Sequence, residues 1–162
     1  MSVKKYVVDT IEFRKGVADI TDPCYPKDVW CRINNVEIHP GTYTCVYWKQ
    51  QNHTITIKGK QYQDNRVTRM GVYLNGIIPN KGAMQYFDCI GVDAGLAGVY
   101  EEKEDFTEDQ WQDFCDDIKN QDYLVGYNGF CTSSGYGDGE YPVYVHTNDD
   151  GLFDAIEIRF IG

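Results

Sequence analysis

The stretch Thr42-Tyr-Thr-Cys-Val-Tyr-Trp48 places Tyr43, Cys45 and Tyr47 at every second position. These three side chains would share one face of a strand, because successive side chains in a β-strand point to opposite faces. We expect this face to lie against the core, with Cys45 as a small core residue. A sheet built around this strand is the predicted basis of the fold.

Strand patterns extend outward from this stretch in both directions. The run from His53 to Lys58 alternates threonine with isoleucine, which is typical of a half-buried antiparallel strand. Near the C-terminal end, Ile156, Ile158 and Phe160 would point inward. The predicted strands are Lys5–Val8, Thr10–Phe13, Val17–Ile20, Thr42–Trp48, Thr54–Lys58, Arg66–Leu74, Tyr86–Val92, Gly98–Glu101, Val143–Thr147 and Ala155–Ile161.

Turn residues separate these runs. Asn75–Ala83 contains Gly76, Pro79 and Gly82, which predicts a long surface loop of the kind that often carries recognition. Asn148–Gly151 reads as a hairpin turn.

One amphipathic helix is predicted over about residues 107–119. Thr107 can cap its N-terminus, and Gln110 three positions later completes a capping box. Apolar residues follow at helical spacing, and they would pack on the sheet: Trp111, Phe114, Cys115 and Ile118.

These elements predict the fold class. We expect an α+β domain, a mostly antiparallel curved sheet or partly open barrel that the helix covers. A chain of 162 residues is long enough to bury a core without a disulfide or metal staple. No linker or internal repeat divides it, so residues 1–162 are expected to form one globular domain.

The sequence shows no apolar stretch long enough for a membrane span and no secretion signal near Met1. We therefore expect a cytoplasmic protein with no membrane partner. Its cysteines lack the paired spacing of common zinc or redox sites and are expected to be reduced thiols. We predict no metal site and no cofactor. The six are Cys24, Cys31, Cys45, Cys89, Cys115 and Cys131.

The charge is uneven. The chain has a formal charge of −10, and its last 62 residues carry 16 acidic and 3 basic side chains. Such a surface repels phosphate backbones, so direct nucleic-acid binding is not expected and a basic protein surface is the favoured partner. The charge could equally serve solubility alone. The predicted binding residues are Glu108, Asp109, Asp113, Asp116, Asp117, Tyr136 and Asp138.

Three segments could carry chemistry. In Thr21-Asp-Pro-Cys-Tyr25, followed by Trp30, Asp22 could be a ligand or base and Cys24 a nucleophile, or Asp22 could cap a turn. A catalytic Cys24 would need a base within hydrogen-bond reach. The candidate bases are His39, His53 and His146.

The other two segments are rich in glycine. Asp93, in Gly91-Val-Asp-Ala-Gly-Leu-Ala-Gly98, could bind a metal, act as a base or stabilise a turn. Asp138, in Ser133-Ser-Gly-Tyr-Gly-Asp-Gly-Glu-Tyr141, could hold a cation, bind a substrate hydroxyl or make an Asx turn. Neither segment matches a phosphate-binding loop or a calcium-binding EF-hand.

Taken in order, these three segments resemble an uncharacterised family of small bacterial and phage proteins, known only as a domain of unknown function. The resemblance covers about residues 20–161 and implies no established activity. It implies that five residues lie near one another: Asp22, Cys24, Asp93, Gly135 and Asp138. Membership in a family that includes phage proteins also implies a role in host takeover or counter-defence.

Two main hypotheses for the function follow. The favoured one is a non-catalytic binding protein, phage or prophage encoded, whose acidic surface engages and blocks a basic host or defence protein. In a variant of it, an aromatic-lined sheet holds a small ligand. The alternative is a small hydrolase or transferase, with or without a metal ion, that uses Asp22, Asp93 and Asp138 with Cys24.

Overall fold

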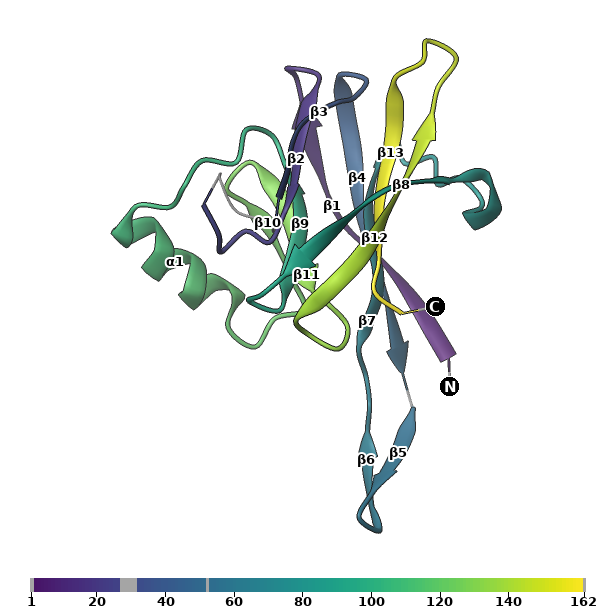
Figure 1. Ribbon diagram of the computed structural model, residues 1–162, viewed down its shortest axis with the longest axis vertical. Coiled ribbons are helices and arrows are strands. Elements are labelled where there is room, and N and C mark those ends of the chain that lie inside the picture. Colours follow the sequence, from purple (N-terminus) through teal and green to yellow (C-terminus); the bar gives the residue numbers. More distant parts are fainter. Residues whose placement is uncertain (1, 27–31, 52, 162) are drawn as a thin grey trace.

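The structure is a computed structural model, and it describes residues 2–26, 32–51 and 53–161. Its strands form three antiparallel sheets, of which two are large and one is a separate hairpin (Figure 1). Trp30 and Cys31, which the sequence analysis singled out, lie outside the described residues.

The larger sheet has six strands, each antiparallel to its neighbours. Their order is β1 (Ser2–Phe13), β4 (Gly41–Gln51), β7 (Val67–Leu74), β13 (Phe153–Arg159), β12 (Gly139–Thr147) and β8 (Gln85–Val92). The C-terminal hairpin of β12 and β13 thus lies between two strands from the middle of the chain. The pairings of β7 with β13 and of β8 with β12 therefore join segments that are distant in sequence.

The second sheet has five strands. Their order is β10 (Tyr123–Gly126), β11 (Gly129–Ser133), β9 (Leu96–Tyr100), β2 (Val17–Thr21) and β3 (Arg32–Glu37). The separate hairpin consists of β5 (Thr54–Ile57) and β6 (Lys60–Gln63), and it projects beyond the larger sheet between β4 and β7 (Figure 1).

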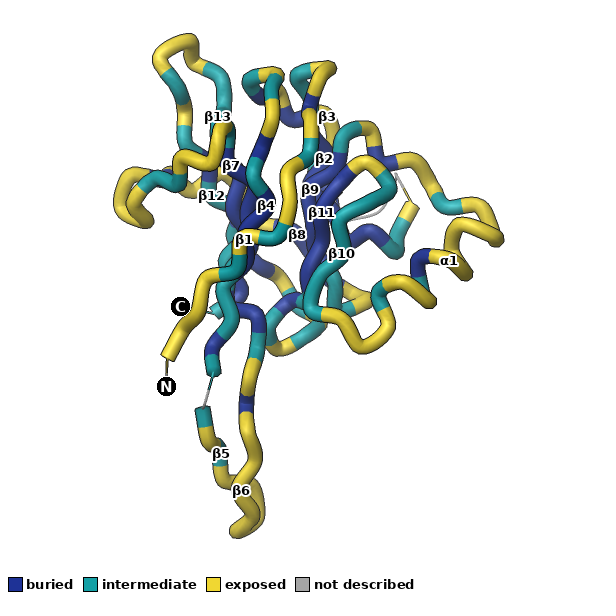
Figure 2. The backbone as a smooth tube through the Cα atoms, turned by 180° about the vertical axis from the view of Figure 1, so that it is seen from behind, coloured by how far each residue is buried: buried dark blue, intermediate teal, exposed yellow. Residues whose placement is uncertain are grey.

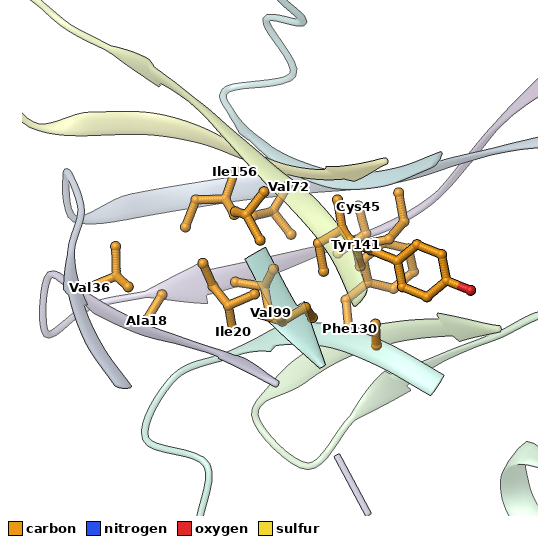
Figure 3. Packing of buried hydrophobic residues seen from close by; sticks show 14 of the residues in the cluster. Ala18, Ile20, Val36, Cys45, Val72, Val99, Phe130, Tyr141 and Ile156 are labelled. Atoms are coloured by element: carbon orange, nitrogen blue, oxygen red, sulfur yellow. The ribbon is translucent and has the colours of Figure 1, made fainter. Parts of the chain in front are cut away.

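The main core lies between the two large sheets. Ile20, Val99 and Phe130 of the five-stranded sheet pack against Val72 and Ile156 of the six-stranded sheet (Figure 3). All five side chains are completely buried. Apolar burial of this kind is the main favourable contribution to folding, at roughly 25 cal/mol per Å². Figure 2 shows the buried strands at the centre and the exposed hairpins outside them.

The alternation in β4 places its side chains as predicted. Tyr43, Cys45 and Tyr47 are buried in the main core, and Val46 is buried on the opposite face of the same strand. The prediction for Cys45 is confirmed, and burial raises the pKa of its thiol to about 12. The inward placement of Ile156, Ile158 and Phe160 is also confirmed.

The predicted helix is confirmed as α1 (Glu108–Ile118). The Thr107 side chain accepts a hydrogen bond from the Gln110 backbone N–H, and the Gln110 side chain accepts one from the Thr107 backbone, so the capping box is complete. The helix packs against the outer face of the five-stranded sheet, but Phe114 is its only buried residue. Trp111 is 41% exposed, and Cys115 and Ile118 are half-buried.

The predicted α+β class is wrong, because strands make up 58% of the structure and helical residues 9%. One helix of eleven residues does not form a layer over a sheet. The sheets also do not close into a barrel, since each large sheet keeps two edge strands. The protein is a mostly β structure of two facing antiparallel sheets.

Two further differences concern strands. The predicted half-buried strand at His53–Lys58 is the largely exposed β5, because its hairpin extends away from the core. Four strands were not predicted from the sequence: β3, β6, β10 and β11.

Both predicted connections are confirmed, and one of them also packs against the larger sheet. Asn148–Gly151 joins β12 to β13 as a turn. The segment 75–84 contains one 3₁₀ turn, η1 (Lys81–Ala83), and folds back over the outer face of the six-stranded sheet. There Ile78 and Met84 pack with Tyr73 in a second apolar cluster.

Candidate protein-binding surface

The acidic side chains of α1 lie on the side of the helix away from the sheet, except for Asp117, which contacts the β10–β11 hairpin. We call them the acidic face. All are exposed, and none is matched by a basic residue within the helix: Glu108, Asp109, Asp113, Asp116 and Asp117. Glu108 and Asp109 occupy the first turn, where the helix dipole favours negative charge. The Asp117 carboxylate accepts a hydrogen bond from the Tyr127 hydroxyl at 3.0 Å, which holds the end of the helix against the β10–β11 hairpin.

An aromatic cluster lies at the N-terminal end of α1. The Phe106 ring packs 5.0 Å from Phe114 and 6.3 Å from Trp111, measured between ring centroids. Phe106 precedes the cap residue Thr107, and Trp111 is the fourth helical residue, so the pair forms a hydrophobic staple at the helix start. This staple keeps Trp111 at the surface.

A hollow of about 220 Å³ separates this cluster from the turn after β2. Trp111 and Phe106 line one side of it, Tyr25 and Pro23 line the other, and Asp105 contributes a carboxylate. A slot lined by aromatic rings and the Asp105 carboxylate suits the side chain of an arginine or lysine, because the aliphatic stem can pack on the rings while the cation meets the acid.

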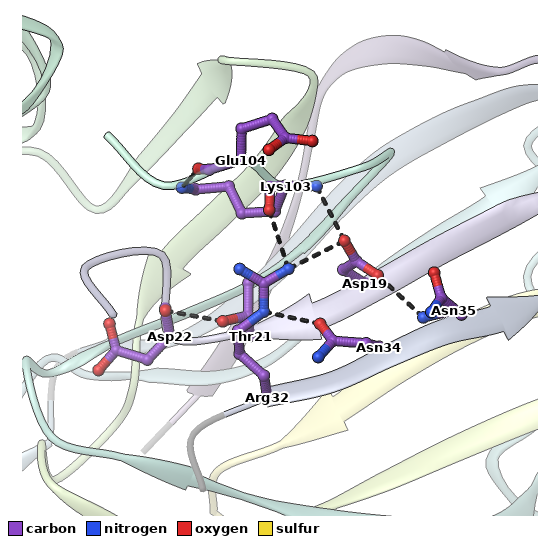
Figure 4. Close-up of polar contacts among 8 residues, drawn as sticks. All are labelled: Asp19, Thr21, Asp22, Arg32, Asn34, Asn35, Lys103 and Glu104. Carbon is purple, nitrogen blue, oxygen red and sulfur yellow. Dashed lines mark hydrogen bonds and ion pairs between the residues drawn. The ribbon is translucent and has the colours of Figure 1, made fainter. Parts of the chain in front are cut away.

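The loop before α1 is attached to the five-stranded sheet by a buried polar network (Figure 4). The Asp19 carboxylate accepts hydrogen bonds from Arg32 Nη2 at 2.9 Å and from the Lys103 backbone N–H at 2.8 Å. Arg32 Nη2 also donates to the Lys103 carbonyl at 2.9 Å. Because Lys103 lies in the loop between β9 and α1, this network anchors that loop to β2 and β3.

Phe106 and this network were not predicted from the sequence. The apolar residue before a predicted cap was a usable signal for Phe106. For Asp19 and Arg32, no local pattern indicates the pairing, because it depends on the register of β2 against β3.

Asp22 is completely buried and joins two turns. One of its oxygens accepts a hydrogen bond from the Cys24 N–H at 3.0 Å. The other accepts from the Asp93 N–H at 3.0 Å and the Ala94 N–H at 2.7 Å. Burial raises the pKa of the Asp22 carboxyl, and these three N–H groups oppose that shift. The arrangement matches the turn-capping interpretation of Asp22.

The structure also places the other residues of the three segments. Asp93 is exposed, and its carboxylate accepts a hydrogen bond from the Tyr25 hydroxyl at 2.6 Å. The Ser134 N–H donates to the Gly95 carbonyl at 3.1 Å, so the third segment meets the second. Tyr136 and Asp138 are exposed on the loop before β12, where the Tyr136 ring stacks with Arg66 rather than lying on α1.

The surroundings of Cys24 do not favour a thiolate. Burial raises the pKa of its thiol, and the neighbouring Asp22 carboxylate raises it further. A nucleophilic cysteine needs the opposite shift, from a nearby cation or a base. His39 Nδ1 contacts the Pro40 carbonyl and His146 Nδ1 contacts Asp154. Within the described residues, no group of three or more His, Cys, Asp or Glu side chains could hold a metal ion.

Replacing Asp22 with alanine is expected to lower the free energy of unfolding by about 2–3 kcal/mol, because three backbone N–H groups lose their acceptor. Equilibrium unfolding in urea measures the change. Asp138→Ala is the matched control and should stay within about 0.5 kcal/mol, since that side chain is exposed. A loss in Asp22→Ala as small as the one expected for the control would show that Asp22 does not stabilise the turns.

Among the described residues, no helix combines the length and apolar character that crossing a membrane requires. Comparison with known protein families, curated proteins and solved structures returned no match. The resemblance to the uncharacterised family of bacterial and phage proteins therefore stays a prediction.

Proposed function

We propose that this chain is a non-catalytic binding protein whose acidic face binds and blocks a basic surface of another protein. The observation that carries the proposal is Trp111, an exposed aromatic side chain beside a hollow that Asp105 also lines, on a helix whose own carboxylates are all exposed. Aromatic anchors near the centre of an interface supply most of its affinity, and the charged surroundings speed encounter with a partner of opposite sign.

The partner is a protein rather than a nucleic acid. A row of carboxylates repels phosphate, but it complements a surface of lysine and arginine. Many such basic surfaces bind nucleic acid, so occupying one would inhibit its owner. A counter-defence inhibitor encoded by a phage or prophage would act in this way. We place it in the cytoplasm, in keeping with free thiols at Cys24, Cys45, Cys89, Cys115 and Cys131.

The enzymatic alternative has less support. It needs Asp22 or Cys24 as a reactive group, whereas backbone N–H groups occupy the Asp22 carboxylate and burial raises the pKa of Cys24. Asp93 and Asp138 stay exposed and could still bind a ligand, so a role for them remains a prediction.

The proposal is tested by capturing partners from a bacterial lysate at low salt. Native mass spectrometry of the tagged protein should show a bound protein that leaves as salt increases, because exposed charge pairs are screened. Asp113→Asn with Asp116→Asn is expected to weaken binding about tenfold, and so is Trp111→Ala. Asp117 is left unchanged in this test because it holds Tyr127.

The matched control removes two exposed charges from the β12–β13 turn, as Asp149→Asn with Asp150→Asn. It changes the net charge by the same amount, and the proposal expects unchanged binding. If both double variants weaken binding equally, net charge rather than the acidic face attracts the partner. If binding persists in high salt and in every variant, the proposal is wrong.

A further inference from the structure

The outer face of the six-stranded sheet carries a cluster of positive charge in an otherwise acidic protein. Arg69 of β7 and Arg159 of β13 are register partners on this face. The Arg69 guanidinium stacks 3.6 Å from the Trp48 ring centroid, and Arg159 stacks 3.6 Å from that of Tyr144. Both arginine side chains are only 13% exposed, so their positions are fixed by packing.

A third cation lies in the segment that folds over this face. Lys81 belongs to η1, and its carbonyl accepts a hydrogen bond from Arg159 Nη2 at 3.2 Å. Its amino group experiences Arg69 and Arg159 as repulsive neighbours and Glu157 as the attractive one, and burial together with the two arginines lowers the pKa of Lys81. Three cations and one carboxylate leave a local charge of about +2.

Glu157 neutralises this cluster only in part, because one carboxylate faces three cations. Its carboxylate is fully buried and accepts hydrogen bonds from the Tyr73 hydroxyl at 2.6 Å and Arg159 Nε at 2.7 Å. The distance from its nearer oxygen to Arg69 Nη1 is 3.5 Å. Within the described part of the chain, this is the one ion pair of Arg69, and its 3.5 Å separation is longer than a hydrogen bond of ordinary length.

A hollow of about 360 Å³ opens beside these cations. Its volume lies in the range of roughly 300–1,000 Å³ that small-molecule sites occupy. Apolar side chains and the two cations Arg69 and Lys81 share its lining. The residues that matter for a ligand are Val3, Trp48, Gln50, Arg69, Lys81 and Ile161.

We propose that this hollow binds a small organic anion. Its carboxylate or phosphate group pairs with Arg69 and Lys81, and its apolar body lies against Trp48, Val3 and Ile161. Arginine held by stacking presents its N–H groups in a fixed plane, which suits carboxylate and phosphate oxygens. An anion with an apolar body gains binding free energy both from charge pairing and from burial of that body. The site is separate from the acidic face and does not depend on the function proposed above.

Isothermal titration of the full chain tests the proposal with four probes: 2-naphthoate, 2-naphthamide, AMP and inorganic phosphate. Naphthoate and naphthamide have the same shape and differ in charge, so naphthoate should bind at least about tenfold more tightly. If AMP binds and naphthoate does not, phosphate is the preferred anionic group, and this result would equally support the site. If neither naphthoate nor AMP binds, or if naphthamide binds as tightly as a naphthoate that does bind, the proposal is overturned.

Matched variants locate the binding. Lys81→Gln should weaken the anion that binds by about tenfold, because it removes a cation from the rim while its backbone carbonyl still accepts from Arg159. Lys60→Gln removes an exposed cation from β6 and should leave affinity unchanged. Equal weakening by both variants, or inorganic phosphate binding as tightly as AMP, would show general charge attraction and overturn the proposal.

Discussion

Replacing Glu157 with alanine is expected to lower the free energy of unfolding by about 3–5 kcal/mol. Glu157 is the buried anion between Arg69 and Arg159, and it also accepts the hydrogen bond of Tyr73. Without it, two largely buried guanidinium groups face each other with no counter-charge. Removing one partner of a buried ion pair costs more than the pair contributes, because the remaining charge stays desolvated.

Urea unfolding followed by circular dichroism measures this loss, and Tyr73→Phe provides the comparison. That variant keeps the ring and removes one hydrogen bond to Glu157, so it should cost about 1 kcal/mol. The Tyr73 ring can reach Glu157 because position 71 is glycine, where a Cβ would lie 2.5 Å from the tyrosine hydroxyl. A loss below about 1 kcal/mol in Glu157→Ala would contradict the expected stabilisation.

The sequence predicted those parts of the structure that short-range patterns determine. The alternation around Cys45 and the capping box at Thr107 each involve residues within four or five positions of one another. Their side chains would occupy the same faces in any strand or helix of this sequence. The exposure of the acidic face follows from the same helical spacing, since one side of α1 packs on the sheet.

Sheet membership could not be predicted in this way. The short strands β10 and β11 carry little alternation, and they pair through a two-residue turn in which Tyr127 and Asn128 both have positive φ angles, 54° and 65°. Asn128-Gly129 was a usable hairpin signal there. In β3, Asn35 also has a positive φ, and a register shift interrupts the pairing of β2 with β3. Asn34 and Asn35 interrupt the apolar pattern of β3, so this strand could not be recognised from alternation, although Arg32 and Val36 are buried.

The two candidate sites differ in the same way, because one follows from local spacing and the other from long-range pairing. The carboxylates of the acidic face could be found from spacing, whereas the cationic cluster could not. Arg69, Lys81 and Arg159 are far apart in sequence and meet only because β7 pairs with β13 and the segment 75–84 folds over them. Apart from their type, nothing in these residues marks them as neighbours.

The Asp19–Arg32 pair provides the second large effect. Asp19→Ala is expected to lower the free energy of unfolding by about 3–5 kcal/mol, because Arg32 would be left without its counter-ion. Its guanidinium is completely buried, and its Nη1 has no hydrogen-bond acceptor among the described residues. The backbone N–H groups of Asn35 and Lys103 would lose their acceptor as well. Urea unfolding again gives the value.

A double-mutant cycle separates the pair from its surroundings. Asp19→Asn with Arg32→Met removes both charges. The double variant should cost less than the sum of the two single variants, because each single variant leaves one unpaired ion and the double variant leaves none. The exposed pair of Arg14 with Glu12 is the matched control, and Glu12→Ala should change stability by less than about 0.5 kcal/mol. Additive losses in the cycle would mean that the two charges do not interact. If they do interact, the Asp19–Arg32 pair contributes to holding β2, β3 and the loop before α1 together, beside the backbone hydrogen bonds that Asp19 accepts.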